Sequence, residues 1–171
     1  MGDTLLFSPS NKTARVMTIE AWNVKDPIVA VRAGQSVGVT LDEQLFIERG
    51  EMASMVTNAP MLSNVFRGRV FWLGRKPLAP GRRYKMKLCT AEYMVEVEKI
   101  ERVIDVSDLR TAKGTQVERN AVGEVVLRAR GLMPVDPFDV NMVTGRFVLI
   151  EDFEIVGGGL INMDDYADQR P

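Results

Sequence analysis

The chain is poor in the side chains that usually carry chemistry. It contains no histidine and a single cysteine, Cys89. The lack of imidazoles excludes histidine-based acid–base catalysis, histidine-activated nucleophiles and histidine-containing metal sites. A lone cysteine excludes an internal disulfide and is typical of a reducing compartment, so we expect a cytoplasmic protein. No activating base lies beside Cys89 in the sequence, and we expect it to be a small buried strand residue.

Carboxylates are the remaining candidates for acid–base chemistry or metal binding. Two groups stand out: Glu96, Glu98, Glu101 and Asp105, and then Asp136 and Asp139. Strand spacing places Glu96 and Glu98 on one outward face, where solvated charges are usual. The second group lies beside prolines and is typical of a loop. We therefore predict no catalytic residue and no metal site in this chain.

Nucleotide-binding motifs are missing as well. A phosphate-binding loop reads G-x-x-x-x-G-K-[ST], and no Gly-Lys pair occurs in the chain. The motif at 11–14, Asn-Lys-Thr-Ala, is similar to the guanine-reading N-K-x-D, but Ala14 stands where the aspartate must be, and we predict a hairpin turn. Gly157-Gly158-Gly159 could form a phosphate-binding nest, but glycines within a strand pattern favour a tight barrel bend. We predict no cofactor-binding residue.

A run of basic residues is the strongest candidate for a binding surface. It consists of Arg67, Arg69, Arg75, Lys76, Arg82, Arg83, Lys85 and Lys87, with no acid between them. Basic residues interleaved with aromatics favour nucleic acid, whereas strand alternation turns the same cations to a solvated outer face. A partner-protein surface is a third interpretation. The formal net charge of −1 favours a protein or intramolecular partner over nucleic acid. We assign the possible partner surface to Arg67, Arg69, Arg82 and Lys85.

Strands are the elements that must position these residues. Period-two alternation of apolar and polar residues predicts strands at 15–22, 37–41, 66–73, 84–88 and 95–106, and closing strands from 122 to 161. A change of phase near 99–100 predicts a bulge. No helical pattern is long enough for a crossover helix, and no apolar run approaches the length of a membrane span. The fold class is therefore all-β, built as antiparallel barrels or a sandwich, and the Pro60 junction favours two barrels over one.

The domain boundary is predicted at Thr57-Asn58-Ala59-Pro60, because proline fixes its own backbone and favours an extended residue before it. We expect a first barrel over 1–58 and a second over 59–161. The polar and acidic tail, 162–171, is expected to be loose or a linker.

Several motifs carry a family resemblance. The segments at 2–3, 32–41 and 48–50 read Gly-Asp, Arg-Ala-Gly-Gln-Ser-Val-Gly-Val-Thr-Leu and Glu-Arg-Gly. They resemble the second domain of elongation factor Tu-like GTPases. The segments at 71–72, 77–84, 120–123 and 144–147 read Phe-Trp, Pro-Leu-Ala-Pro-Gly-Arg-Arg-Tyr, Asn-Ala-Val-Gly and Thr-Gly-Arg-Phe. They resemble, more specifically, the third domain of the GTPase subunit of sulfate adenylyltransferase.

The resemblance implies two small antiparallel Greek-key β-barrels that form a non-catalytic region of a larger protein. Its barrels would support a GTPase domain whose GTP hydrolysis helps a partner catalytic subunit to make adenylylsulfate from ATP and sulfate in sulfate assimilation. GTP and magnesium are then expected only in that GTPase domain. The alternative is a translation elongation factor fragment that binds tRNA or a ribosomal partner. A self-standing barrel that binds a small molecule is a third, weaker interpretation.

Two departures from the family pattern carry further expectations. The run at 42–50 lacks the family's usual acidic pattern, which favours a divergent branch such as a form fused to adenylylsulfate kinase, with 162–171 as the linker. The chain also begins where the family's second domain has already formed a strand pair, so we expect an incomplete first barrel. An exposed sheet edge invites pairing with another chain, and the hypothesis is that the isolated chain dimerises or swaps strands. A monomer in light scattering at high concentration would contradict it.

Overall fold

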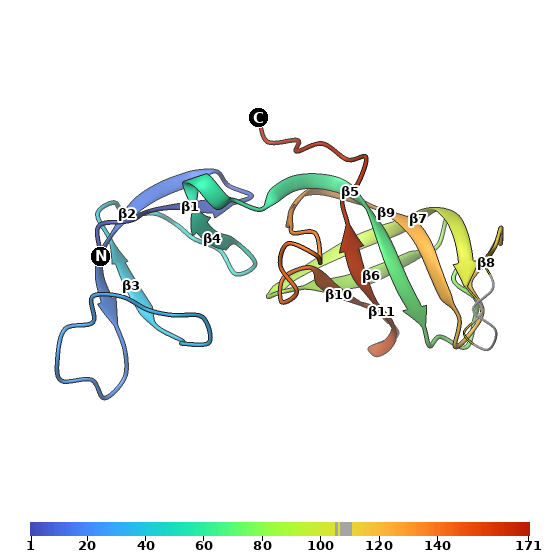
Figure 1. Ribbon diagram of the computed structural model, residues 1–171, viewed down its shortest axis with the longest axis horizontal. Coiled ribbons are helices and arrows are strands. Elements are labelled where there is room, and N and C mark those ends of the chain that lie inside the picture. Colours follow the sequence, from blue (N-terminus) through green and yellow to red (C-terminus); the bar gives the residue numbers. More distant parts are fainter. Residues whose placement is uncertain (105, 107–110) are drawn as a thin grey trace. The chain divides into compact units, whose positions relative to one another are not determined.

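The computed structural model describes residues 1–104, 106 and 111–171. Apart from one short 3-10 turn, η1 (Val56–Asn58), the regular structure of the described residues is β-strand, which confirms the all-β prediction. The chain divides into two compact units, Met1–Pro60 and Met61–Pro171, which we call unit 1 and unit 2. Figure 1 labels the strands of both.

Unit 1 is an open antiparallel sheet with the strand order β3-β2-β1-β4. The strands are β1 (Thr4–Ser8), β2 (Lys12–Glu20), β3 (Gly38–Leu41) and β4 (Met52–Met55). The turn between β1 and β2 contains Asn11 in the left-handed region at φ 57°, so the Asn-Lys-Thr-Ala segment lies in a hairpin, as predicted. The sheet ends in two edges, β3 and β4.

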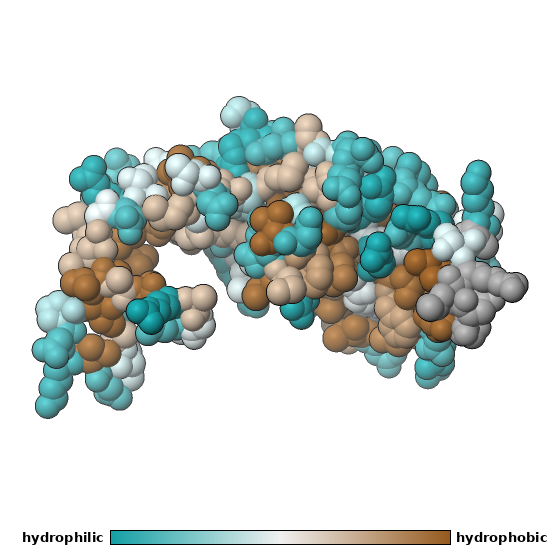
Figure 2. Space-filling view, viewed as in Figure 1, coloured by the Kyte–Doolittle hydropathy of each residue, from teal (hydrophilic) through white to brown (hydrophobic). Residues whose placement is uncertain are grey.

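The core of unit 1 is small. Its buried apolar side chains are Leu6, Phe7, Ala14 and Val16. Trp22 and Phe46 are 93% and 77% exposed, and Figure 2 shows apolar side chains on the surface of this unit. A unit that leaves this much apolar surface in water gains little stability from burial. Dimerisation or strand exchange through its edges stays a prediction.

Unit 2 contains a closed six-stranded antiparallel barrel. Its strands are β5 (Met61–Trp72), β6 (Arg83–Leu88), β7 (Ala91–Ile104), β9 (Val122–Val135), β10 (Arg146–Glu151) and β11 (Glu154–Asn162). They follow each other around the barrel in the order β5-β9-β7-β6-β10-β11, and β11 pairs with β5. The short strand β8 (Thr111–Ala112) pairs with the end of β7. Because β5 lies beside β9 and not beside β6, the connection is a Greek key.

Bulges bend the strands where the barrel closes. The register of β7 against β9 shifts between Val97 and Lys99 and again between Ile100 and Arg102, which confirms the bulge predicted near 99–100. The register of β5 against β9 shifts after Ser63. There the buried Ser63 hydroxyl donates to the carbonyl oxygen of Val65 at 2.6 Å, and thereby satisfies a polar group inside the bulge.

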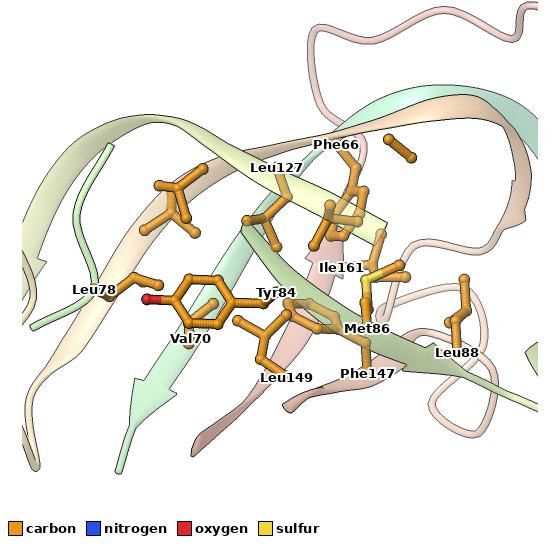
Figure 3. Packing of buried hydrophobic residues seen from close by; sticks show 14 of the residues in the cluster. Phe66, Val70, Leu78, Tyr84, Met86, Leu88, Leu127, Phe147, Leu149 and Ile161 are labelled. Atoms are coloured by element: carbon orange, nitrogen blue, oxygen red, sulfur yellow. The ribbon is translucent and has the colours of Figure 1, made fainter. Parts of the chain in front are cut away.

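Side chains that alternate between the inner and the outer face of the strands fill the barrel interior. In β6, Tyr84, Met86 and Leu88 are buried while the basic residues between them face outward, as predicted. Tyr84 packs edge-on against Trp72, with the ring centroids 5.2 Å apart. Figure 3 shows the packing of the buried core, and the labelled residues are Phe66, Val70, Leu78, Tyr84, Met86, Leu88, Leu127, Phe147, Leu149 and Ile161.

Two of the three consecutive glycines of β11 provide space for aromatic rings. A Cβ atom on Gly159 would lie 2.5 Å from the Phe147 ring, and one on Gly157 would lie 2.9 Å from the Trp72 ring. The register of β10 against β11 also shifts beside Gly157. The glycines therefore let the backbone of β11 lie directly against two core side chains.

The polar tail packs against the barrel, and is not loose over its whole length. Met163 is buried, and the backbone N–H of Gln169 donates to the carbonyl oxygen of Leu62 at 2.7 Å. The Asp168 carboxylate accepts the N–H of Leu62 at 2.8 Å. The buried Met163, the Asp168 side chain and the Gln169 backbone thus attach to the barrel a segment whose composition had predicted a linker.

Candidate partner-binding surface

The four residues of the predicted partner surface do not form one patch. Arg67 and Arg69 lie on β5, Lys85 lies on β6, and Arg82 lies just before β6. In the six-stranded barrel, β5 and β6 are separated by two strands in either direction. Outward-facing residues of such strands point to opposite sides of a closed barrel, so the structure separates the β5 pair from the β6 pair.

Each of these cations already has an acidic neighbour within unit 2. Lys85 pairs with Glu92 of β7 at 3.1 Å, and Arg82 pairs with Glu151 at the end of β10. Exposed pairs of this kind contribute only about 0–1 kcal/mol of stability. The basic run therefore meets its acids on other strands, which agrees with the intramolecular alternative raised by the sequence.

One charge cluster on the barrel surface was missed by the sequence analysis. The Glu124 side chain on β9 is only 6% exposed and accepts from Arg69 Nη2 at 3.1 Å and from Arg102 Nε. Arg69 on β5 and Arg102 on β7 are both register partners of Glu124 on β9, which lies between these strands. The strand register therefore brings the three side chains together. The sequence did contain one sign of this cluster, a single acidic residue within the apolar run 122–127. In the fold this run lies opposite the basic residues of β5.

A groove of about 550 Å³ lies beside this cluster and is lined also by Phe138 and Leu160. The Arg69 side chain is 59% exposed, so it retains N–H donors for a further carboxylate or phosphate. Because the Glu124 carboxylate is held between two guanidiniums, the arrangement is suited to binding and offers no free base for acid–base chemistry.

A second charge cluster connects two strands of the barrel to the C-terminal tail. Arg67 Nε donates to Glu101 at 2.6 Å, and Lys99 Nζ lies 2.8 Å from the same carboxylate. Hydrogen bonds from Arg67 and then from Lys99 lower the pKa of Glu101 below its ordinary value of 4.5. Arg67 also lies over the Tyr166 ring, 5.9 Å from its centroid, and so connects β5 and β7 to the tail.

The Glu101 cluster predicts a pH-dependent contribution to stability. Because its pKa is lower in the folded chain, the Glu101 carboxylate contributes stability that is present above about pH 4.5 and is lost as the pH falls through the folded value. Urea denaturation at pH 7 should show Glu101→Gln to be less stable than the unmodified chain, with the difference shrinking in acid. Arg67→Gln should behave alike, and Lys99→Gln should have a smaller effect. A difference that stays constant with pH would contradict this assignment.

The other candidate acids are distributed over separate partners. Glu96 accepts from Arg83 at 2.8 Å and Glu98 from Arg128 at 2.5 Å, on the outer face expected for them. Asp136 accepts the Thr144 hydroxyl in a loop, as expected; Asp139 is exposed in the same loop, and Asp105 lies outside the described residues. Within the described part of the chain, no group of three or more acidic, histidine or cysteine side chains is arranged to hold a metal ion.

Cys89 was expected to be a buried strand residue, and this prediction was wrong. It lies exposed in the two-residue turn between β6 and β7, in the left-handed region at φ 51°. Partial desolvation, and then the charge of Asp136, raise the pKa of its thiol. A raised pKa disfavours the thiolate, so the position gives no support for a nucleophile.

The barrel and its charge clusters belong to a known class of protein. The family model described as GTP-eEF1A C-terminal domain-like matches residues 65–162, which covers nearly all of the barrel. The chain belongs to this family, within the elongation factor Tu-like GTPases.

Curated relatives match over both units. The chain is 28% identical to the bifunctional enzyme NodQ of Azospirillum brasilense over 162 residues, which are 94% of this chain and 26% of that protein. It is 29% identical to sulfate adenylyltransferase subunit 1 of Alteromonas mediterranea over 168 residues, 97% of this chain and 35% of that protein. The chain thus spans about a quarter to a third of the length of these relatives.

Solved structures support the fold. The structure of Sup35 complexed with GDP superposes with a TM-score of 0.82 at 19% identity, over 94% of this chain and 40% of that one. At this identity the similarity shows the fold alone. Within the residues described here, no helix is long and apolar enough to cross a lipid bilayer.

Proposed function

We propose that this chain is the non-catalytic β-barrel region of a sulfate adenylyltransferase GTPase subunit. The observation that supports it is the similarity to sulfate adenylyltransferase subunit 1 over 97% of the chain, together with the family match to the barrel. In the whole enzyme, the barrels support GTP-regulated synthesis of adenylylsulfate from ATP and sulfate. GTP and magnesium belong to a GTPase domain outside this chain, and the chemistry belongs to a catalytic subunit.

The contribution of this chain is then a rigid binding surface. Among the four proposed contact residues, Arg69 and Lys85 are the most exposed, with side chains 59% and 45% accessible. Arg67 and Arg82 are more deeply engaged with Glu101 and Glu151, so we assign them mainly to holding the barrel. Since Arg69 and Lys85 lie on opposite sides of the barrel, they contact different surfaces of the assembly.

Association with the catalytic sulfate adenylyltransferase subunit of the same organism tests this function. Biolayer interferometry with the purified full chain should detect a complex. Arg69→Gln combined with Lys85→Gln should weaken that complex about tenfold, while thermal unfolding changes little. Glutamine is used because a glutamate at 69 would lie against the Glu124 carboxylate. Arg128→Gln is the matched control, since Arg128 is similarly exposed and similarly paired.

The outcomes separate the alternatives. No complex at high protein concentration would overturn the proposed function. A complex that the double variant leaves unchanged would remove Arg69 and Lys85 as contacts. Binding to tRNA with a steep dependence on salt would favour the translation-factor alternative instead. The cytoplasmic location and the fusion to a kinase domain stay predictions.

A further inference from the structure

The hairpin that joins β10 to β11 contains an unusual residue. Asp152 and Phe153 form its two-residue turn, with φ values of 48° and 67°, both in the left-handed region. Turns of this kind favour Asn-Gly or Asp-Gly, because the second position suits a residue without Cβ. A bulky aromatic residue there is a true outlier, and such outliers persist mainly where function requires them.

Packing within the barrel does not explain this aromatic residue. Phe153 is 100% exposed, so its ring gains nothing from folding to offset the strained backbone. Ile155, two residues further on, is 59% exposed. The backbone N–H of Leu73 donates to the carbonyl oxygen of Val156 at 2.8 Å, which places the partly exposed Leu73 beside the same strand. The result is an apolar site on the hairpin that pairs β10 with β11.

The surrounding charges indicate what could cover it. Glu151 and Glu154 lie opposite each other in the strand register and Asp152 precedes Phe153, so three acids adjoin Phe153 in the turn. Glu151 is neutralised by Arg82, whereas Asp152 and Glu154 are exposed. Acidic surroundings repel nucleic-acid phosphates and anionic lipid headgroups. They complement a protein pocket that is apolar inside and lined by lysine or arginine at its rim.

We propose that Phe153, supported by Ile155, is the apolar anchor that enters a cation-rimmed pocket of the catalytic subunit. This proposal rests on the proposed function, because it names the contact that the barrel makes with that partner. Aromatic side chains held on rigid elements are typical binding hot spots, since they bury a large area at a small entropic cost.

Phe153→Gly tests the proposal because it acts in opposite directions on binding and on folding. Glycine accepts the left-handed backbone without strain and no packing is lost, so the variant should melt at or above the temperature of the unmodified chain. Its affinity for the catalytic subunit should fall at least about tenfold, as expected for a hot-spot aromatic. Both are measured on the full chain, by thermal unfolding and by biolayer interferometry.

Two further variants provide controls. Asp152→Asn keeps a residue that tolerates the left-handed turn but removes one negative charge, and should weaken binding less while reducing its salt dependence. Val143→Ser removes another exposed apolar side chain, in the loop at the opposite end of β10, and should leave the affinity unchanged.

The remaining outcomes are distinguishable. If the unmodified chain binds and Phe153→Gly binds equally well, the anchor is overturned while the proposed function stands. If the unmodified chain does not bind, the proposed function and the anchor are both overturned. A clear drop in melting temperature for Phe153→Gly would assign the ring a structural role. Phe153-dependent binding to phosphatidylserine vesicles would point to a membrane surface and contradict the proposal.

Discussion

Phe147→Ala is expected to lower the free energy of unfolding of unit 2 by about 3–5 kcal/mol, the usual cost of removing a buried aromatic side chain. The Phe147 ring is buried, packs edge-on against Phe66 with centroids 5.3 Å apart, and lies over the glycine backbones of two strands. No neighbouring side chain extends from Gly68 or Gly159 to fill the space. The cavity therefore cannot easily collapse, which places the cost at the upper end of the range.

A double-mutant cycle tests whether the close contact with the Phe147 ring is the reason for a glycine at position 159. Gly159→Ala should cost about 1–3 kcal/mol in the unmodified chain, because its Cβ would lie 2.5 Å from Phe147. With Phe147→Ala already present, the added cost should be smaller by about 1–2 kcal/mol. Urea denaturation followed by tryptophan fluorescence is a suitable measurement, since Trp72 is buried while Trp22 is already exposed. Equal costs in both backgrounds would show that the contact is not the reason for the glycine.

Gly145→Ala should destabilise unit 2 by about 3 kcal/mol, at the upper end of overpacking costs. A Cβ at this position would lie 2.5 Å from the Cα of Phe138 and 2.8 Å from the carbonyl oxygen of Asn141. These are backbone atoms, which cannot rotate away as a side chain can. The loop would also lose the hydrogen bonds that Gly145 makes to Asn141 and Ile161, at 2.8 and 2.9 Å.

Gly131→Ala on β9 is the matched control. A Cβ there meets no atom within 4 Å, and its backbone is not in the left-handed region. Alanine should therefore be neutral, or stabilising by about 0.5 kcal/mol through the reduced freedom of the unfolded chain. If both substitutions cost the same, the close approach at Gly145 would not be the cause.

These contacts explain why one segment of the family resemblance was informative. Gly145 and Phe147 both belong to Thr-Gly-Arg-Phe, in which the glycine permits the loop to approach Phe138 and the phenylalanine fills the barrel. On β11, Gly159 lies against the same ring and Gly157 lies against that of Trp72. The motifs thus record packing requirements of one barrel, which is why they identified the fold more securely than the function.

Local pattern was enough for much of the architecture. Alternation along β6 correctly predicted which residues face the core, the change of phase near 99–100 correctly predicted a bulge, and the hairpin at Asn11 followed from turn chemistry. These features depend on neighbours one to four residues apart, so a single sequence contains them. The absence of a guanine-reading aspartate was likewise visible directly in the sequence.

The candidate surface depended on contacts that no local pattern contains. Closure of six strands sends Arg67 and Lys85 to opposite sides, although they lie only 18 positions apart in the numbering. The pairing of β9 with β5 and β7 brings Arg69 and Arg102 to Glu124. The C-terminal tail folds back and brings Asp168 to Leu62. Charge balance, tail docking and the exposure of Phe153 are set by such long-range neighbours. The sequence by itself determined strand-built barrels of a known family, whereas the tertiary structure alone decided which charges are neutralised within the fold and which side chains remain available to a partner.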